Sequence, residues 1–133
     1  MKVAFLTAGG LAPCLSASIA YLIKEYSKID NSIEFFGYKN GYKGLLLGQK
    51  VSIPSKLRTK TSLLASYGGS PIGNSRVKLS NIQDCIKNKY ISKDQIPLQV
   101  ASNQLKKDGI NILHTIGGDD TNTSAGDLVK YLK

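Results

Sequence analysis

The stretch KVAFLTAGG, residues 2–10, indicates the fold class of this chain. It begins with a short, mostly apolar run, which Ala8-Gly9-Gly10 stops abruptly. A short apolar run bounded by glycines is typical of a buried strand. Beyond Pro13, which the first turn of a helix tolerates, apolar side chains recur at helical spacing: Leu15, Ile19, Leu22, Ile23 and Tyr26. We therefore expect a strand, a Gly-Gly turn and a helix, in that order.

The same pattern returns near the other end of the chain, in the stretch INILHTIGGDDTNTSA. Here we predict a strand over Ile110–Ile116, a turn at Gly117-Gly118 and a helix that begins near Thr123. A further strand is predicted over residues 32–37, SIEFFG. Strands that alternate with helices form parallel sheets. The predicted fold is therefore α/β, with a Rossmann-like parallel sheet flanked by helices in a single domain over residues 1–133.

The chain between these units has less regular patterns. Residues 38–48 are rich in Gly and Tyr, and we expect a loop there. Capping residues, Pro and Gly delimit the helices in this part of the chain. The other predicted elements are a helix over 56–66, a helix capped by Ser80 that runs to Tyr90, and a helix capped by Asp94 that holds Pro97 in its first turn and ends at Gly109.

The composition is that of a globular protein. The chain has 133 residues, of which 41% are hydrophobic and 20% charged, and this suits one domain with its own core. No apolar run approaches the roughly 20 residues of a membrane helix, and the N-terminus lacks the pattern of a signal peptide. Cys14 and Cys85 are too few for a disulfide scaffold, and with His114 they lack zinc-ligand spacing. We therefore predict a cytoplasmic protein with reduced thiols, without a membrane segment or zinc.

Positive charge is concentrated in the middle of the chain. Eleven Lys or Arg and one acid, Asp84, lie between Phe36 and Lys93, whereas the net charge of the whole chain is +9. A localised basic stretch favours an anionic partner, although solvated surface lysines would give the same count. Nucleic acid and a small phosphorylated ligand are the two candidate anions. No RNA-binding or DNA-binding motif supports the first candidate, so we predict no nucleic acid.

Both Gly-Gly turns lie where an α/β sheet binds its ligands. Each turn follows a strand and precedes a helix, so both fall at the carboxyl ends of parallel strands. The unpaired N–H groups of a helix N-terminus attract anions there, and glycine lets a phosphate approach the backbone. An ordinary tight turn is the alternative, because the chain has neither a Walker loop nor a G-x-G-x-x-G fingerprint.

Polar residues after the second turn favour a site for phosphate and a metal ion. Asp119 and Asp120 would either cap the following helix or hold Mg²⁺, which binds through one or two carboxylates together with phosphate oxygens. Thr121 and Asn122 can donate hydrogen bonds to phosphate. Arg76, in the glycine-rich segment GGSPIGNSRVK, would clamp phosphate through its guanidinium, unless it is an ordinary surface arginine.

Several other polar side chains could have either a functional role or a purely structural one. His114 lies inside a predicted strand, which favours a hydrogen-bonded core histidine over a catalytic one. Cys14 opens the first helix, where the pKa of a thiol falls, but no nearby base is visible, which favours a structural role. Tyr38, Tyr42 and Tyr67 either line the site or pack in the core, and the sequence leaves both possibilities open.

Four segments together resemble the phosphofructokinases, and specifically their pyrophosphate-dependent branch. The segments follow the family's order and span nearly the whole chain, and GGDDTNT is highly specific. They are LTAGGLAPCLSASI (6–19), GYKNGYKGL (37–45), GGSPIGNSRVKL (68–79) and HTIGGDDTNTSA (114–125). The resemblance implies a glycolytic or gluconeogenic phosphotransferase that moves a phosphoryl group reversibly from pyrophosphate to the 1-hydroxyl of fructose 6-phosphate, with Mg²⁺.

The resemblance also implies roles for the matching residues. Asp119 would hold Mg²⁺. The residues that would contact the donor phosphate are Gly9, Gly10, Arg76, Gly118, Thr121 and Asn122. Asp120 would decide which donor is accepted, because ATP-dependent relatives usually have Gly at this position. A carboxylate there would occupy the space of the nucleotide α-phosphate and repel its charge, so pyrophosphate would be admitted and ATP would not.

One departure from the family pattern limits what the chain would do alone. The family's catalytic base is an aspartate in a Thr-x-Asp-x-Asp motif downstream of Gly-Gly-Asp-Asp, and the chain reaches Lys133 before such a motif. We therefore expect an N-terminal part of the family's domain, with a donor site but little or no turnover by itself. The full-length protein is expected to be a homo-oligomer. Two other hypotheses stay open: a non-catalytic phosphate-binding or regulatory module, and an ATP-dependent 6-phosphofructokinase.

Overall fold

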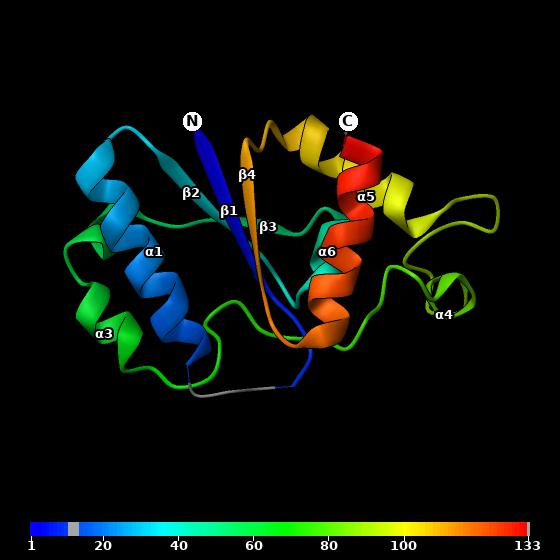
Figure 1. Cartoon of the computed structure of the whole chain (residues 1–133), viewed down its shortest axis with the longest axis horizontal. Helices are drawn as coiled ribbons and strands as arrows, with labels where there is room; N and C mark the ends of the chain where they lie inside the picture. Colours follow the sequence, from blue (N-terminus) through cyan, green and yellow to red (C-terminus); the bar gives the residue numbers. More distant parts are fainter. Residues whose placement is uncertain (11–13, 133) are drawn as a thin grey trace.

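A four-stranded sheet with helices on both faces forms the protein (Figure 1). The computed structural model describes residues 1–10 and 14–132, so the predicted place of Pro13 in a first helical turn lies outside the described residues. The strands are β1 (Lys2–Thr7), β2 (Glu34–Tyr38), β3 (Lys50–Ser52) and β4 (Ile112–Ile116). Their order across the sheet is β3-β2-β1-β4.

The three predicted strands are present and parallel. β1 lies between β2 and β4 and pairs in parallel with both. Successive side chains of a strand point to opposite faces, so Val3 and Phe5 pack on one face of the sheet and Ala4 and Leu6 on the other, all without solvent exposure. The central strand is thus buried on both faces, as parallel strands of α/β proteins are.

The predicted parallel sheet is present in β2, β1 and β4, but an antiparallel edge strand that the sequence did not predict makes the whole sheet mixed. β3 runs antiparallel to β2, with Val51 opposite Gly37. It follows Gly48, whose left-handed backbone (φ 69°) ends helix α2 (Tyr42–Leu47) and turns the chain back toward the sheet. A strand of three residues is too short to show the alternation by which strands are recognised, which explains why the sequence did not predict it.

The helices form a layer on each face of the sheet (Figure 1). They are α1 (Leu15–Ile29), α2 (Tyr42–Leu47), the 3₁₀ helix η1 (Ser55–Arg58), α3 (Thr61–Ala65), α4 (Ile82–Lys87), α5 (Pro97–Asp108) and α6 (Asp119–Leu132). α1 packs on the face of β1 that carries Val3 and Phe5, and α3 packs against α1. α2, α5 and α6 pack on the opposite face. Among the described residues, no helix combines the length and the apolar character that a membrane span requires.

Two predictions in the middle of the chain were wrong. Residues 38–48 were expected to form a loop, but α2 forms there because Leu45 and Leu46 are buried in the core. α4 was expected to be capped by Ser80, but the side chain of Asn81 caps it, accepting a backbone hydrogen bond at 3.2 Å. The helix expected over 56–66 is present as two short pieces, η1 and α3, and α4 ends before Tyr90.

The boundaries of the last two helices also differ from the prediction. α5 begins at Pro97 without a side-chain cap, so the predicted cap at Asp94 was wrong, whereas Pro97 in the first turn and Gly109 at the end are confirmed. α6 begins at Asp119, earlier than the predicted Thr123. Both carboxylates of the GGDD motif therefore lie in the first turn of this helix, where negative charge is favoured by the helix dipole.

Candidate functional site

The turns that follow β1 and β4 lie side by side at one end of the sheet. The Ala8 N–H donates to the Ile116 carbonyl oxygen at 3.0 Å, which joins the first turn to the end of β4. A Cβ on Gly117 would lie 2.5 Å from the Ala8 carbonyl oxygen and would also collide with the Thr121 side chain. Position 117 therefore requires glycine, because the two turns pack directly against each other.

The glycine-rich segment, residues 68–78, lies against the first of these turns. The Gly9 N–H donates to the Ser75 carbonyl oxygen at 2.8 Å. The Ser75 hydroxyl donates to the Asn40 carbonyl oxygen at 2.6 Å. The segment therefore joins the turn after β1 to the loop after β2, and it brings Arg76 to the same end of the sheet.

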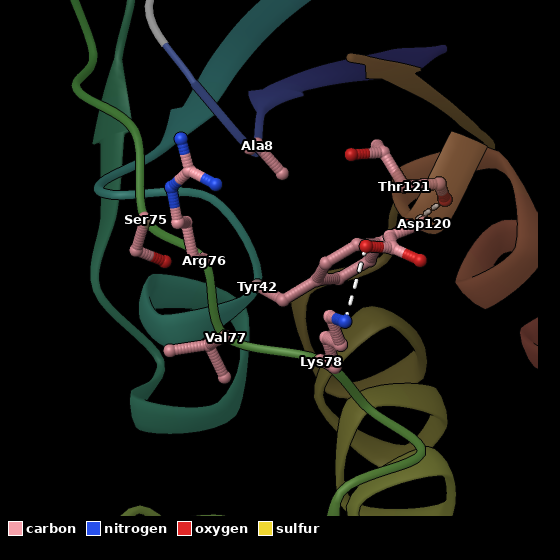
Figure 2. A pocket seen from close by; sticks show the side chains of 9 residues that line it. Ala8, Tyr42, Ser75, Arg76, Val77, Lys78, Asp120 and Thr121 are labelled. Carbon is pink, nitrogen blue, oxygen red and sulfur yellow. Dashed lines mark hydrogen bonds and ion pairs between the residues drawn. The ribbon is translucent and has the colours of Figure 1, made fainter. Parts of the chain in front are cut away.

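These loops enclose a cavity of about 180 Å³ (Figure 2). Its walls combine the backbone of the first turn with side chains from the glycine-rich segment, from α2 and from the first turn of α6. The lining residues are Ala8, Gly9, Tyr42, Ser75, Arg76, Val77, Lys78, Asp120 and Thr121. The cavity thus lies at the carboxyl ends of parallel strands and beside a helix N-terminus, which is where α/β sheets bind anions.

Two basic side chains and one acidic side chain line the cavity. Lys78 Nζ lies 3.1 Å from Asp120 Oδ2, the ion pair marked in Figure 2. These side chains are 49% and 74% exposed, so their pair contributes at most about 1 kcal/mol to stability. Arg76 Nη2 lies 3.3 Å from the position that a Cβ would occupy if Gly10 carried a side chain, so the guanidinium lies beside the first glycine turn. The three side chains together carry a net positive charge, which favours an anionic ligand.

Tyr42 both lines the cavity and packs, which answers the question that the sequence left open. Its hydroxyl donates to the Thr121 carbonyl oxygen at 2.8 Å and so joins α2 to α6. Burial raises the pKa of Tyr42 to about 12, so the hydroxyl stays a hydrogen-bond donor at neutral pH. The other candidate tyrosines lie elsewhere, since Tyr38 donates to Asp108 at 2.6 Å and Tyr67 is largely exposed.

The structure brings part of the predicted site together. The predicted residues that line the cavity are Gly9, Arg76, Asp120 and Thr121. Gly10 lies beside the Arg76 guanidinium. Gly10 is outside this lining, and so are three exposed residues at the start of α6: Gly118, Asp119 and Asn122.

Lys78 is a cavity residue that the sequence did not single out. It lies two positions after Arg76 in the same glycine-rich segment. The presence of a second cation close to Arg76 was therefore the signal that could have identified Lys78. Ser75 and Val77 carried no such signal, because their place in the lining depends on how the glycine-rich segment crosses the first turn.

Much of the basic middle stretch lies away from the cavity. Arg58 donates to the Asn31 carbonyl oxygen at 2.7 Å and stacks over the Phe35 ring. Lys50 Nζ lies 3.5 Å from Asp108 Oδ1. These contacts hold loops and strands together, so the charge count of the stretch overstates the positive charge at the cavity.

The described residues offer limited material for a metal site. Within residues 1–10 and 14–132 there is no group of three or more His, Cys, Asp or Glu that would enclose a metal ion. Mg²⁺ needs only one or two carboxylates when phosphate oxygens complete its shell; Asp119 and Asp120 are the two carboxylates in the first turn of α6, and of these Asp120 lines the cavity. His114 Nε2 lies 2.9 Å from the Tyr26 hydroxyl, and burial lowers its pKa, which confirms the predicted hydrogen-bonded histidine.

Residues 2–133 match the family model described as phosphofructokinase. The chain belongs to the phosphofructokinase family. The matched range includes both glycine turns, the glycine-rich segment and the acidic start of α6. The resemblance that the four sequence segments indicated is therefore confirmed.

Two curated relatives are similar to this phosphofructokinase chain over nearly its whole length. The pyrophosphate–fructose 6-phosphate 1-phosphotransferase of Methylotuvimicrobium alcaliphilum is 59% identical over 131 residues, which are 98% of this chain and 32% of the relative. The protein of the same name from Methylomonas methanica is 56% identical over the same shares of the two chains. This chain therefore spans about a third of the length of these relatives.

A solved structure shares the fold of this chain. The pyrophosphate-dependent phosphofructokinase from Nitrosospira multiformis superposes with a TM-score of 0.76 at 18% identity. The superposition covers 97% of this chain and 29% of the other. The α/β class predicted from the alternating strands and helices is thereby confirmed.

Proposed function

We propose that this chain forms the donor site of a pyrophosphate-dependent phosphofructokinase. Such an enzyme moves a phosphoryl group reversibly from pyrophosphate to the 1-hydroxyl of fructose 6-phosphate and releases phosphate and fructose 1,6-bisphosphate. The observation that carries the proposal is the cavity at the ends of β1 and β4, which Arg76 and Asp120 line together. The names of the two relatives, both pyrophosphate–fructose 6-phosphate 1-phosphotransferases, support the same donor and acceptor.

The residues of this chain would act by binding and by neutralising charge. Phosphoryl transfer depends chiefly on positioning and on stabilising the charge of the transferred group. Arg76, which lines the cavity, would bind two donor oxygens through its planar guanidinium, and Gly9 would let a phosphate come close to the backbone. The N-terminal turn of α6 adds the positive end of a helix dipole to the same space.

Asp120 is the residue proposed to select pyrophosphate over ATP. Its carboxylate belongs to the cavity lining and pairs with Lys78. A nucleotide donor would bring a third phosphate into the space that this carboxylate occupies, and like charges at short range are unfavourable. Pyrophosphate has no further phosphate beyond the two that the site would hold.

Asp119 is the residue proposed to hold Mg²⁺. When bound, the ion would neutralise charge on the donor phosphates. The proposal extends to the whole protein as a cytoplasmic homo-oligomer of glycolysis or gluconeogenesis. The catalytic base and most of the sugar site are not assigned to residues of this chain.

Isothermal titration of the purified chain with Mg-pyrophosphate tests the proposal. We expect saturable binding, and we expect Arg76→Ala to weaken it by about tenfold or more, because a charged hydrogen bond is lost. Arg76→Lys keeps the charge but not the bidentate fork, so it should bind with intermediate affinity. Lys130→Ala removes an exposed charge of α6 paired with Asp127, away from the cavity lining, and serves as the control. Absence of binding, or equal affinity in the Arg76→Ala variant, would contradict the proposal.

A further inference from the structure

Thr7, the last residue of β1, is a buried threonine whose hydroxyl has three polar neighbours. It has no solvent exposure. Its Oγ1 lies 2.6 Å from Ser70 Oγ, 2.9 Å from the Gly73 carbonyl oxygen and 2.9 Å from Asn74 Oδ1. A single hydroxyl of the central strand is thus bonded to three residues of the glycine-rich segment.

The chemistry of the partners determines the direction of these hydrogen bonds. Asn74 Nδ2 lies 3.4 Å from the Gly9 carbonyl oxygen and 3.3 Å from the Gly10 carbonyl oxygen. Carbonyl oxygens can only accept, so Asn74 must turn its amide nitrogen toward them and its Oδ1 toward Thr7. The Thr7 hydroxyl then donates, sharing its proton between Asn74 Oδ1 and the Gly73 carbonyl oxygen.

This orientation bears on anion binding because carbonyl oxygens repel phosphate. With both carbonyls of the first turn bonded to Asn74, their negative ends face the glycine-rich segment. Gly9, which lines the cavity, has a positive φ of 82°, a conformation that glycine adopts without strain but does not by itself enforce. The hydrogen bonds from Thr7 and Asn74 supply the restraint that two adjacent glycines lack.

We propose that Thr7 and Asn74 are positioning residues for the donor cavity. Thr7 sets the orientation of the Asn74 amide. Asn74 in turn fixes the orientation of the Gly9 and Gly10 carbonyls. Through these hydrogen bonds it also fixes the position of the glycine-rich segment, which carries Arg76. Neither residue is among the described residues that line the cavity, so both act through the turn and not by contact with the ligand. The inference rests on the proposed function, since the ligand concerned is pyrophosphate.

Thr7→Val tests this role because valine keeps the branched shape and removes the hydroxyl. Titration with Mg-pyrophosphate should show binding weaker by about tenfold. The reason is that Asn74 loses the hydrogen bond from the Thr7 hydroxyl, and the Gly9-Gly10 turn then loses the restraint that Asn74 provides. Thr7→Ser restores the hydroxyl and should restore affinity. Asn74→Ala, at a half-buried position outside the core, should weaken binding in the same way and does not depend on the core tolerating Thr7→Val.

Ser102→Ala is the matched control for loss of a buried hydroxyl. Ser102 is as buried as Thr7, and its hydroxyl donates to the Tyr131 carbonyl oxygen at 2.9 Å, between α5 and α6. This variant should lose stability in urea unfolding but keep its affinity for Mg-pyrophosphate. Equal loss of affinity in Ser102→Ala would mean that Thr7 acts only through general stability, which would overturn the proposal.

Nuclear magnetic resonance of the ligand-free chain provides a readout that does not depend on binding. Thr7→Val should shift the backbone amide signals of Gly9 and Gly10 and the side-chain amide signals of Asn74, and it should speed their hydrogen exchange. If the wild type binds Mg-pyrophosphate and Thr7→Val binds equally tightly, or if Thr7→Ser fails to restore affinity, the positioning role is overturned while the proposed function stands. If the wild type does not bind, the proposed function fails, and this inference fails with it.

Discussion

Asp120 is a carboxylate in a cavity that otherwise attracts anions. It lies in the first turn of α6 and pairs at 3.1 Å with Lys78, which belongs to the same glycine-rich segment as Arg76. A negative charge at this place repels every anionic ligand and so weakens its binding, and the repulsion increases with each phosphate that comes near it. The carboxylate is therefore suited to distinguish donors by their length and charge, which is the role proposed for it.

Asp120→Gly should raise affinity for Mg-ATP relative to Mg-pyrophosphate by about tenfold, because one like-charge contact and one side chain are removed. Asp120→Asn keeps the size and removes the charge, so comparing the two variants in titrations separates repulsion from steric exclusion. Asp127→Asn removes an acid of the same helix outside the cavity lining and controls for net charge. An unchanged ratio of ATP to pyrophosphate affinity in both Asp120 variants would contradict the proposed selectivity.

The two strand-to-helix turns work as one unit because they are in direct contact. Gly117 has no room for a side chain, whereas its neighbour Gly118 has no atom within 4 Å of the place of a Cβ. The Thr121 side chain, on the first turn of α6, fills the space next to Gly117. This contact therefore joins the first turn, whose Ala8 and Gly9 line the cavity, to the start of α6, whose Asp120 and Thr121 also line it.

Gly117→Ala should lower the free energy of unfolding by about 1–3 kcal/mol, because the new methyl group would overlap the Ala8 carbonyl oxygen and the Thr121 side chain. Gly118→Ala, next to it in open space, should leave stability within about 0.5 kcal/mol of the wild type. Urea unfolding followed by circular dichroism measures both changes. Similar stabilities for the two variants would show that the contact between the turns is looser than described.

A polar network around Asp108 joins the sheet to the helical layer of one face. Tyr38 of β2 donates to Asp108 Oδ2 at 2.6 Å, Gln104 of α5 donates to the same oxygen at 3.1 Å, and Lys50 of β3 lies 3.5 Å from Oδ1. Burial alone would raise the pKa of Asp108, but these hydrogen bonds and the charge of Lys50 outweigh it and lower the pKa below its usual value. The ionised carboxylate therefore stabilises the folded protein as a whole.

Because the pKa of Asp108 is lower in the folded chain, its stabilisation is complete above the usual carboxyl pKa near 3.9 and is lost as the pH falls through the lower folded value. Asp108→Asn should reduce the free energy of unfolding by about 1–3 kcal/mol at pH 7, and the difference from wild type should shrink below about pH 3.5. Urea unfolding at both pH values measures this. Asp127→Asn, which removes a half-buried acid paired with Lys130, should show a smaller effect. If the stability difference between Asp108→Asn and the wild type does not vary with pH, the account is contradicted.

The strands and their glycine turns were predictable because the signals are local. Lys2–Thr7 is a strand as predicted, and the strand over Ile112–Ile116 lies within its predicted range. The helix at Tyr42–Leu47 was not predictable, because its six residues gain stability from burial of two leucines and not from their own propensity. The start of α6 was misplaced because Asp119 and Asp120 were expected to cap the helix or to hold Mg²⁺, although both carboxylates also suit its first turn.

The sequence alone determined the α/β class, the family and four of the residues that line the cavity, because short apolar runs, glycine pairs and the GGDD motif are visible in neighbouring residues. Tertiary structure alone decided the antiparallel edge strand and the hydrogen bonds of Thr7 to the glycine-rich segment. It also decided which cations of the basic middle stretch face the cavity: Lys78 lines it, whereas Arg58 supports a loop. The physical reason is that these features join residues far apart in the chain, and such contacts form only when the sheet brings the segments together.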